Sequence, residues 1–331
     1  MNRIENILIG FSLADALGVP VEFNSRRSLQ KDPVINMRSY GTYNQPAGTW
    51  SDDSSLSFCL AESLCDGYDL KNIAQKFVAW THSKIWTPHG DVFDIGIQTS
   101  SSIRKLATIL DNEEYDTLSD LKNTGDERTN GNGSLMRIIP LLFFIKGKNI
   151  KNQFKSVWEV SALTHPHFRS ALSCLIHLKF AEHISNGSSI EKAYSKMKTD
   201  INQFCIDEDF PKYEMNHFDR LLNNDIKKLT LDSINSSGYV IDTLEASFWC
   251  LLNSNSYVSS VLKAINLGHD TDTTACVVGG IAGMYYGLEE VPEIWINRIT
   301  RIKDIKELAS KFENSLIKEK QNERETNKNN Q

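Results

Sequence analysis

Apolar residues recur at intervals of three and four along most of this chain, which is the spacing of an amphipathic helix. The first such run, 4–17, ends at the helix-breaking Gly18-Val19-Pro20. Alternating apolar and polar residues, the pattern of a half-buried strand, are nearly absent. The pattern therefore predicts an all-α fold, with further helices at 53–65, 71–83, 94–109, 115–121, 151–163, 168–184, 240–252, 257–267, 275–286 and 305–317.

The predicted domain organisation is simple. No internal repeat and no clear linker divides the chain, so one domain over 1–317 is favoured. Residues 24–47 are polar and predicted to be irregular. Residues 186–235 are polar with intermittent helical spacing, which suggests a peripheral insertion. The charged residues 318–331 predict a disordered tail.

Composition narrows the functional classes. The 331 residues are 40% apolar, enough for a sizeable core, and the net charge of −6 argues against nucleic-acid binding. The six cysteines contain no C-x-x-C pair, as expected for reduced thiols. Asp15 interrupts the apolar run 7–21, which argues against a signal peptide, and no other run is long enough to span a bilayer. We expect a cytoplasmic protein that does not act at a membrane.

Two aspartate pairs, each at the start of a predicted helix, are the main candidates for chemistry. Each pair alone could merely complement a helix dipole. If the pairs converge, their carboxylates repel one another strongly unless a cation lies between them. Oxygen ligands without a Cys and His set favour Mg²⁺ or Mn²⁺ over Zn²⁺. The two clusters offer enough ligands for two ions: Ser51, Asp52, Asp53, Asp270, Asp272 and Thr273.

Other polar residues stand in apolar or turn-forming surroundings. Glu22 has apolar neighbours on both sides, and Asp94 is either a helix N-cap or a site carboxylate. The turn 131–134, Gly-Asn-Gly-Ser, could present backbone N–H groups to an anion. Arg137 lies in an apolar run and, if buried, needs an anionic or carbonyl partner. His165, at a hinge between two predicted helices, is either a cap or a ligand.

Five motifs occur in the order in which one protein family has them. They are GFSLADALGVPVE at 10–22, GTWSDDS at 48–54, DIG at 94–96, GNGSLMR at 131–137 and HDTDT at 269–273. Through these motifs, most of the chain resembles the ADP-ribosylglycohydrolase family. The resemblance implies a compact single-domain orthogonal helical bundle with two Mg²⁺ or Mn²⁺ ions in a cleft.

The resemblance also implies roles for individual residues. The six oxygen ligands named above would hold the metals. Glu22 or Asp94 would activate water or protonate the leaving group while the metals hold the ribose hydroxyls. The substrate would contact a further set of residues: Gly96, Gly131, Asn132, Gly133, Ser134, Met136 and His165.

Three motifs depart from the family pattern. Ser51 and Ser54 replace the usual threonines around the Asp pair, which keeps the hydroxyl oxygens. Ala14-Asp15 replaces Gly-Asp, a mild packing change. Gly268-His269 replaces Gly-Gly before the last motif. We therefore predict that His269 contacts the substrate, or alters the pH profile, beside the metal site.

The predicted function is a hydrolase that removes ADP-ribose from a modified protein side chain, arginine being favoured, or from a related ADP-ribosyl compound. Its partners would be the ADP-ribosylated protein and the released ADP-ribose. An alternative is an ADP-ribose-binding or toxin-neutralising immunity protein that occludes an ADP-ribosylating toxin without turnover. A third interpretation makes the aspartates helix caps in an unrelated α-helical protein. The intact aspartate set favours catalysis, because a pure binder has no need of four aspartates.

Overall fold

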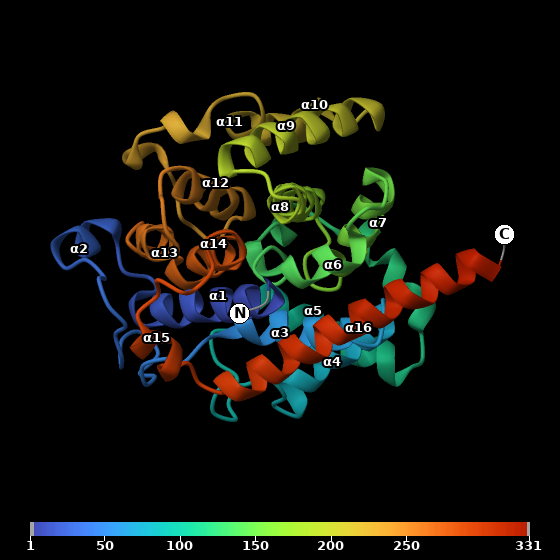
Figure 1. The fold of residues 1–331 in the computed structure, drawn as a ribbon, viewed down its shortest axis with the longest axis horizontal. Coiled ribbons are helices and arrows are strands. Elements are labelled where there is room, and N and C mark those ends of the chain that lie inside the picture. The colour runs from blue at the N-terminus through green and yellow to red at the C-terminus, as the bar shows by residue number, and fades with distance from the viewer. Residues whose placement is uncertain (1–2, 330–331) are drawn as a thin grey trace.

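Two helices from opposite ends of the chain lie side by side at the centre of the protein (Figure 1). The computed structural model describes residues 3–329. In it, α1 (Arg3–Gly18) packs along α14 (Thr271–Tyr286) with almost no side chain between the two backbones. A Cβ atom on Gly10 would lie 2.6 Å from the Gly279 carbonyl oxygen. The glycines of α14, unfavourable in an isolated helix, thus serve this close approach.

The remaining helices surround this pair and bury a continuous apolar core. Within the described residues the backbone forms no sheet, and its extended pairing is confined to the isolated bridge Gly131–Tyr239. The predicted all-α class is confirmed. The larger surrounding helices are α3 (Asp52–Leu64), α4 (Leu70–His82), α5 (Ile97–Asp111), α7 (Ile150–Ala162), α8 (Phe168–Ser185), α12 (Val240–Leu252) and α13 (Tyr257–Ile265).

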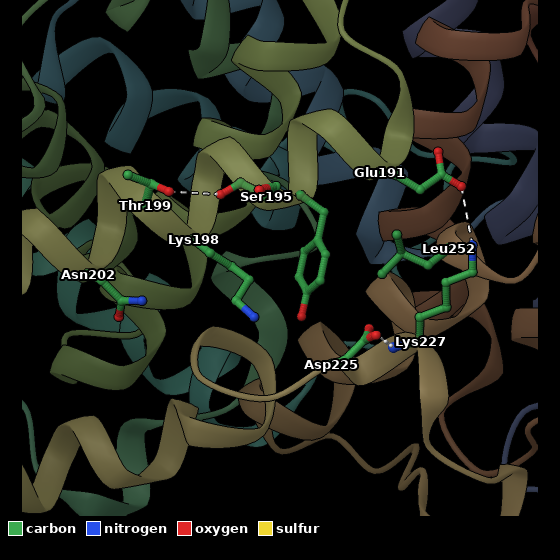
Figure 2. Close-up of a pocket in the computed structure, with 9 residues that line it drawn as sticks. Glu191, Ser195, Lys198, Thr199, Asn202, Asp225, Lys227 and Leu252 are labelled. Atoms are coloured by element: carbon green, nitrogen blue, oxygen red, sulfur yellow. Dashed lines mark hydrogen bonds and ion pairs between the residues drawn. The ribbon is translucent and has the colours of Figure 1, made fainter.

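Helices within residues 186–235, the predicted peripheral insertion, form an outer layer of the protein. Helices α9 (Ile190–Asp207), α10 (Lys212–Met215) and α11 (Asp219–Leu222) lie together along one edge of the molecule, where α9 packs on α8 (Figure 1). A cavity of about 520 Å³ that is open to solvent lies between α9 and the segment that carries Asp225 and Lys227 (Figure 2). Lys198 and Lys227 line it, but Lys198 donates to the Asn224 carbonyl and Lys227 pairs with Glu191. Its charged groups are therefore already partnered.

Helix α16 (Ile302–Asn329) differs from the sequence-based expectation. It crosses α3 as a long helix and continues beyond residue 317, where a disordered tail was predicted (Figure 1). Residues 318–329 contain no Gly or Pro and are rich in Lys and Glu, which favour helix even without an apolar face. Of the predicted tail, 330 and 331 lie outside the described residues.

Three short helices lie in stretches with no predicted helix. They are α2 (Arg26–Lys31), which Ser25 caps, the single turn α6 (Leu142–Ile145), and α15 (Glu293–Arg298). Helix α1 with the following turn is apolar enough, by length and composition, to cross a membrane. However, 94% of its most apolar window is buried inside the protein.

Candidate active site

The N-termini of α3 and α14 bring the two aspartate clusters into direct contact. Ser51 caps α3 by accepting a hydrogen bond from the Asp53 N–H, and Asp270 stands at the N-cap position of α14. The Asp53 carboxylate accepts hydrogen bonds from the hydroxyls of Ser51 and Thr273, each at 3.1 Å. Residues 220 positions apart therefore share one hydrogen-bonded cluster. The dipoles of both helices stabilise negative charge at this point.

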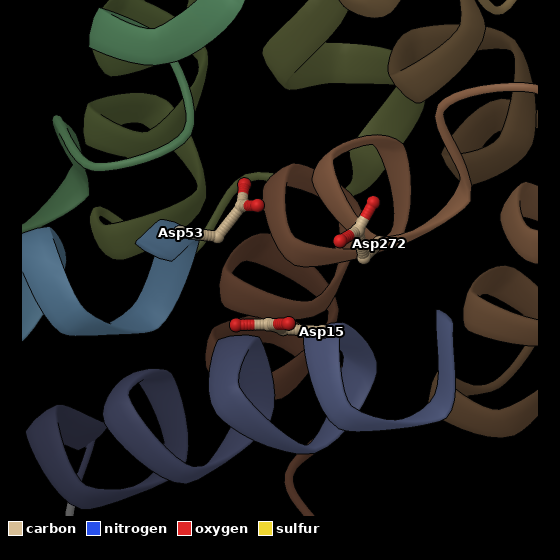
Figure 3. A group of neighbouring side chains, drawn as sticks. All are labelled: Asp15, Asp53 and Asp272. Atoms are coloured by element: carbon tan, nitrogen blue, oxygen red, sulfur yellow. The ribbon is translucent and has the colours of Figure 1, made fainter. Parts of the chain in front are cut away.

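Asp15, which the sequence analysis did not assign to the site, lies beneath this cluster (Figure 3). It extends from α1 toward Asp53 and Asp272, and one carboxylate oxygen from each of the three lies within 4.8 Å of the others. Asp15 accepts hydrogen bonds from the N–H groups of Ser51 and Ser54 at 3.0–3.1 Å, and from the Ser54 hydroxyl. It thus caps α3 from a neighbouring helix and holds the start of that helix in place.

Several buried carboxylate oxygens lack a hydrogen-bond partner. Within the described residues these are Glu22 Oε2, Asp53 Oδ1, Asp270 Oδ1 and Asp272 Oδ2. Oxygens of Glu22, Asp270 and Asp272 also lie within 4.8 Å of one another. Leaving a buried charged oxygen unpaired is costly. A hard divalent cation removes that cost, because it takes carboxylate oxygens as ligands. The donor set therefore fits Mg²⁺ or Mn²⁺.

Burial and mutual repulsion make these carboxyl groups hard to ionise. Burial, followed by the charge of Asp94, raises the pKa of Glu22 to about 9. Burial raises the pKa of Asp15 to about 7. Burial also raises the pKa values of Asp52, Asp53, Asp270 and Asp272, with neighbouring carboxylates adding to the effect. Burial alone raises the pKa of Asp94, and its hydrogen bonds partly offset that rise. A perturbed cluster of this kind is characteristic of a functional site.

A cleft of about 290 Å³ opens above the carboxylates. Glu22, Asp52 and Asp270 form part of one side, and the glycine-rich turn forms another. The Asn132 amide donates to Asp270 Oδ2 at 2.8 Å and to the Thr243 hydroxyl at 2.9 Å. Asn132 therefore orients a site carboxylate. The remaining lining residues are Phe23, Asp94, Gly96, Ile97, Gln98, Thr99, Gly131, Gly133, Met136, His165, Gly238 and Thr273.

His165 packs directly against the glycine-rich turn. A Cβ atom on Gly133 would lie 2.6 Å from the His165 ring, so a side chain there would displace the imidazole. Burial lowers the pKa of His165 to about 3, which keeps the ring neutral at physiological pH. Its Nδ1 shares a hydrogen bond of 2.9 Å with the Thr164 hydroxyl. The ring thus contributes a neutral polar edge to the cleft.

Arg137 is fully buried behind the same turn. Its guanidinium donates to the carbonyl oxygens of Gly133 and Val160 and lies 4.9 Å from the Phe77 ring centroid. The expectation that a buried Arg137 would need carbonyl partners agrees with these contacts. Because one partner is Gly133, the arginine fixes the turn that forms one side of the cleft.

Three non-glycine residues in the left-handed region border the site carboxylates. Phe23 (φ 63°) follows Glu22, His269 (φ 63°) precedes Asp270, and Asp94 itself has φ 58°. Phe23 N–H donates to the His269 carbonyl, and His269 N–H donates to the Asn24 carbonyl, both at 2.7 Å. This reciprocal pairing holds two strained residues in place and directs Glu22 and Asp270 into the cleft. Such strain is concentrated at functional sites.

A protein-family model described as ADP-ribosylglycohydrolase matches residues 1–325, which is nearly the whole chain and includes every residue of this cleft. The chain belongs to the ADP-ribosylglycohydrolase family. It is therefore a glycohydrolase by family, and the interpretation of the chain as an unrelated α-helical protein is excluded.

Two relatives within the family give a finer comparison. An ADP-ribosylarginine hydrolase, Tri1 of Serratia proteamaculans, is 31% identical over 94% of this chain and 79% of its own length. The ADP-ribosyl-[dinitrogen reductase] glycohydrolase of Rhodospirillum rubrum is 24% identical over 90% of each chain. A solved ADP-ribosylglycohydrolase-related protein complex has the same fold, with a TM-score of 0.76, 23% identity and coverage of 95% and 98% of the two chains.

Most residues that the sequence analysis assigned to this glycohydrolase site lie in or directly beneath the cleft, but two do not face it. The Ser134 hydroxyl bonds with Ser161 and Cys174 in the interior, because the turn directs it away from the opening. His269 is exposed and lines a separate groove beside the cleft, together with Arg26 and Asp242. Asp94 precedes α5 and is not its N-cap, a position that Gly96 occupies.

Proposed function

We propose that this glycohydrolase removes ADP-ribose from ADP-ribosylated arginine side chains by means of a two-ion Mg²⁺ or Mn²⁺ centre. The observation that carries the proposal is the buried group of unpartnered carboxylate oxygens at the cleft. The arginine linkage is favoured because the relative with 31% identity over 94% of the chain is an ADP-ribosylarginine hydrolase.

The metals would be held by residues from three segments. Ser51, Asp52 and Asp53 would contribute from α3, and Asp270, Asp272 and Thr273 from α14, with Glu22 beside them. When bound, the ions would neutralise the carboxylates and orient the hydroxyls of the ribose next to the scissile bond. Asp15 would serve the centre indirectly, because its acceptor oxygens are already used by Ser51 and Ser54.

Hydrolysis breaks the bond between the anomeric carbon of the ribose and a guanidine nitrogen, and forms a bond between that carbon and a water oxygen. The nitrogen gains a proton and the water loses one. Glu22 and Asp94 face the same cleft, so one can hold the proton for the nitrogen while the other accepts the proton from water. The transition state resembles an oxocarbenium ion, which nearby carboxylates stabilise.

The remaining residues would bind the nucleotide. The turn from Gly131 to Gly133 exposes backbone at the cleft, and Met136 and the neutral His165 ring border it. Gly96 lies at the start of α5, where backbone N–H groups can meet the diphosphate. These contacts would hold ADP-ribose while the modified arginine extends toward Glu22 and Asp94.

An ADP-ribosylated protein would be the substrate, in the cytoplasm, and an ADP-ribosylating toxin could be what modifies it. Neutralising such a toxin by occlusion alone is the competing function. It is less favoured because occlusion has no need of buried, unpartnered carboxylates.

The linkage can be tested by presenting arginine-linked and serine-linked ADP-ribosyl proteins in parallel and measuring free ADP-ribose. We expect faster release from the arginine-linked protein. Faster release from the serine-linked protein would refute the arginine assignment. Absence of turnover on both, with ADP-ribose still bound, would favour the occluding protein.

A further inference from the structure

Tyr43, a residue with no role in the site described above, lies between the two segments that carry the acid/base carboxylates. It belongs to the irregular stretch between α2 and α3 and is partly buried. Its hydroxyl donates a short hydrogen bond to Asp94 Oδ1. Glu22 is among the groups that raise the pKa of the Tyr43 phenol, after burial and Asp94.

The ring of Tyr43 contacts both of these segments as well. It packs on Phe93, the neighbour of Asp94, with 5.3 Å between ring centroids and a tilt of 53°. It also meets Phe23, the neighbour of Glu22, edge-on at 6.4 Å. Aromatic contacts of this geometry are favourable. The hydroxyl therefore orients one carboxylate, and the ring sets the distance between the two backbone segments.

This contact matters because the loop that carries Asp94 has little regular structure of its own. Asp94 lies three residues before α5, with a left-handed backbone. Carboxylates that cleave glycosidic bonds need a defined separation, and a displacement of about 1 Å can cost about 100-fold in rate. A donor that binds Oδ1 leaves Oδ2 for the cleft that Asp94 lines.

We propose that Tyr43 is a positioning residue that holds Asp94 in its catalytic orientation opposite Glu22. The proposal rests on the hydrolase function proposed above. It does not depend on the arginine linkage, because the same carboxylates act whichever ADP-ribosyl bond is cleaved.

The test compares Tyr43→Phe with the wild type and with Tyr40→Phe. Tyr43→Phe keeps the ring contacts and removes the hydroxyl, while Tyr40 is 67% exposed in the same segment and serves as the matched control. The substrate is whichever linkage the wild type cleaves. For Tyr43→Phe we expect kcat to fall about 10- to 100-fold with KM within about twofold, and both parameters unchanged in Tyr40→Phe. Unchanged melting temperatures show that the variants are folded.

A double-mutant cycle with Asp94→Asn, under single-turnover conditions, separates positioning from a general structural effect. If Tyr43 acts through Asp94, Tyr43→Phe should slow the Asp94→Asn enzyme by less than about twofold. Additive losses in the cycle, a normal kcat in Tyr43→Phe, or a loss confined to KM would overturn the proposal. Lack of turnover in the wild type would instead defeat the hydrolase function itself, and would be seen before any variant is compared.

Discussion

Asp272→Asn should stabilise the metal-free protein while removing its response to metal. Asp272 is fully buried, with one oxygen accepting from the Thr273 N–H and the other unpartnered. Its carboxylate lies within 4.8 Å of carboxylate oxygens of Asp15 and Asp53. At an effective dielectric constant of about 20, two charges at that distance would repel by about 3 kcal/mol. Keeping the carboxyl protonated at pH 8, as its raised pKa favours, avoids that repulsion but also costs folding free energy. An amide removes the charge and can donate to a neighbouring carboxylate.

The net gain is smaller, because the amide is a weaker acceptor for the Thr273 N–H. We expect Asp272→Asn to be more stable by about 2 kcal/mol at pH 8 in EDTA, raising the melting temperature by about 3 °C. In saturating Mn²⁺ the order should reverse, because the wild type gains about 4 kcal/mol at about 1,000 times its dissociation constant and the variant gains much less.

The assay is thermal unfolding of both proteins in EDTA and in a Mn²⁺ titration. Asp120→Asn is the matched control, because Asp120 is an exposed aspartate outside the site, and it should change neither curve. A variant that is less stable than the wild type in EDTA would refute the reasoning, since it would make Asp272 a structural acceptor. An equal Mn²⁺ response in both proteins would refute the assignment of Asp272 as a ligand.

Three further predictions test the helix packing and the buried polar groups of the fold. Gly283→Ala places a Cβ atom on the Asn6 carbonyl oxygen, so it should cost at least about 2 kcal/mol in urea unfolding; an unchanged midpoint would contradict the close packing of α1 on α14. Arg137→Met leaves the buried Gly133 carbonyl without its hydrogen-bond donor, so it should lower the free energy of unfolding by about 3 kcal/mol and weaken ADP-ribose binding in calorimetry. Unchanged affinity would show that the turn keeps its shape without the arginine. Burial lowers the pKa of His177 to about 4, so the stability that comes from burying the neutral ring is fully present above about pH 6.5 and is lost as pH falls toward 4. Between about pH 6.5 and 4 the free energy of unfolding should fall by up to about 3 kcal/mol more in the wild type than in His177→Leu. An equal fall in both proteins would refute this prediction.

Local patterns were sufficient to predict most helices and both aspartate clusters. The runs that became α1, α3, α7 and α8 are predicted to within a few residues, because their apolar spacing and caps lie in the segment itself. The Ser51 cap is of the same kind. Convergence of the clusters could be reasoned only conditionally, since repulsion among carboxylates matters only once the fold brings them together.

Residues whose role depends on tertiary contacts were missed or misplaced. Asp15 reads as an interruption of an apolar run, and its use as a cap for α3 appears only when α1 packs beside it. Tyr43 lies in a polar stretch without periodicity, far in sequence from its partner Asp94. Ser134 fits an anion-binding turn by pattern, yet the fold directs its hydroxyl to Ser161. An aspartate inside a buried helix was the one signal that could have indicated such a contact.

The central claim is that carboxylates from α3 and α14 form a metal centre that hydrolyses an ADP-ribosyl bond. Its most direct test is the rate of ADP-ribose release from an arginine-linked protein in Mn²⁺, after EDTA, and after Mn²⁺ is restored, with Asp270→Ala/Asp272→Ala in parallel. We predict that EDTA stops release, that Mn²⁺ restores it, and that the double variant stays inactive throughout. Release at the full rate in EDTA, or by the double variant, would contradict the claim.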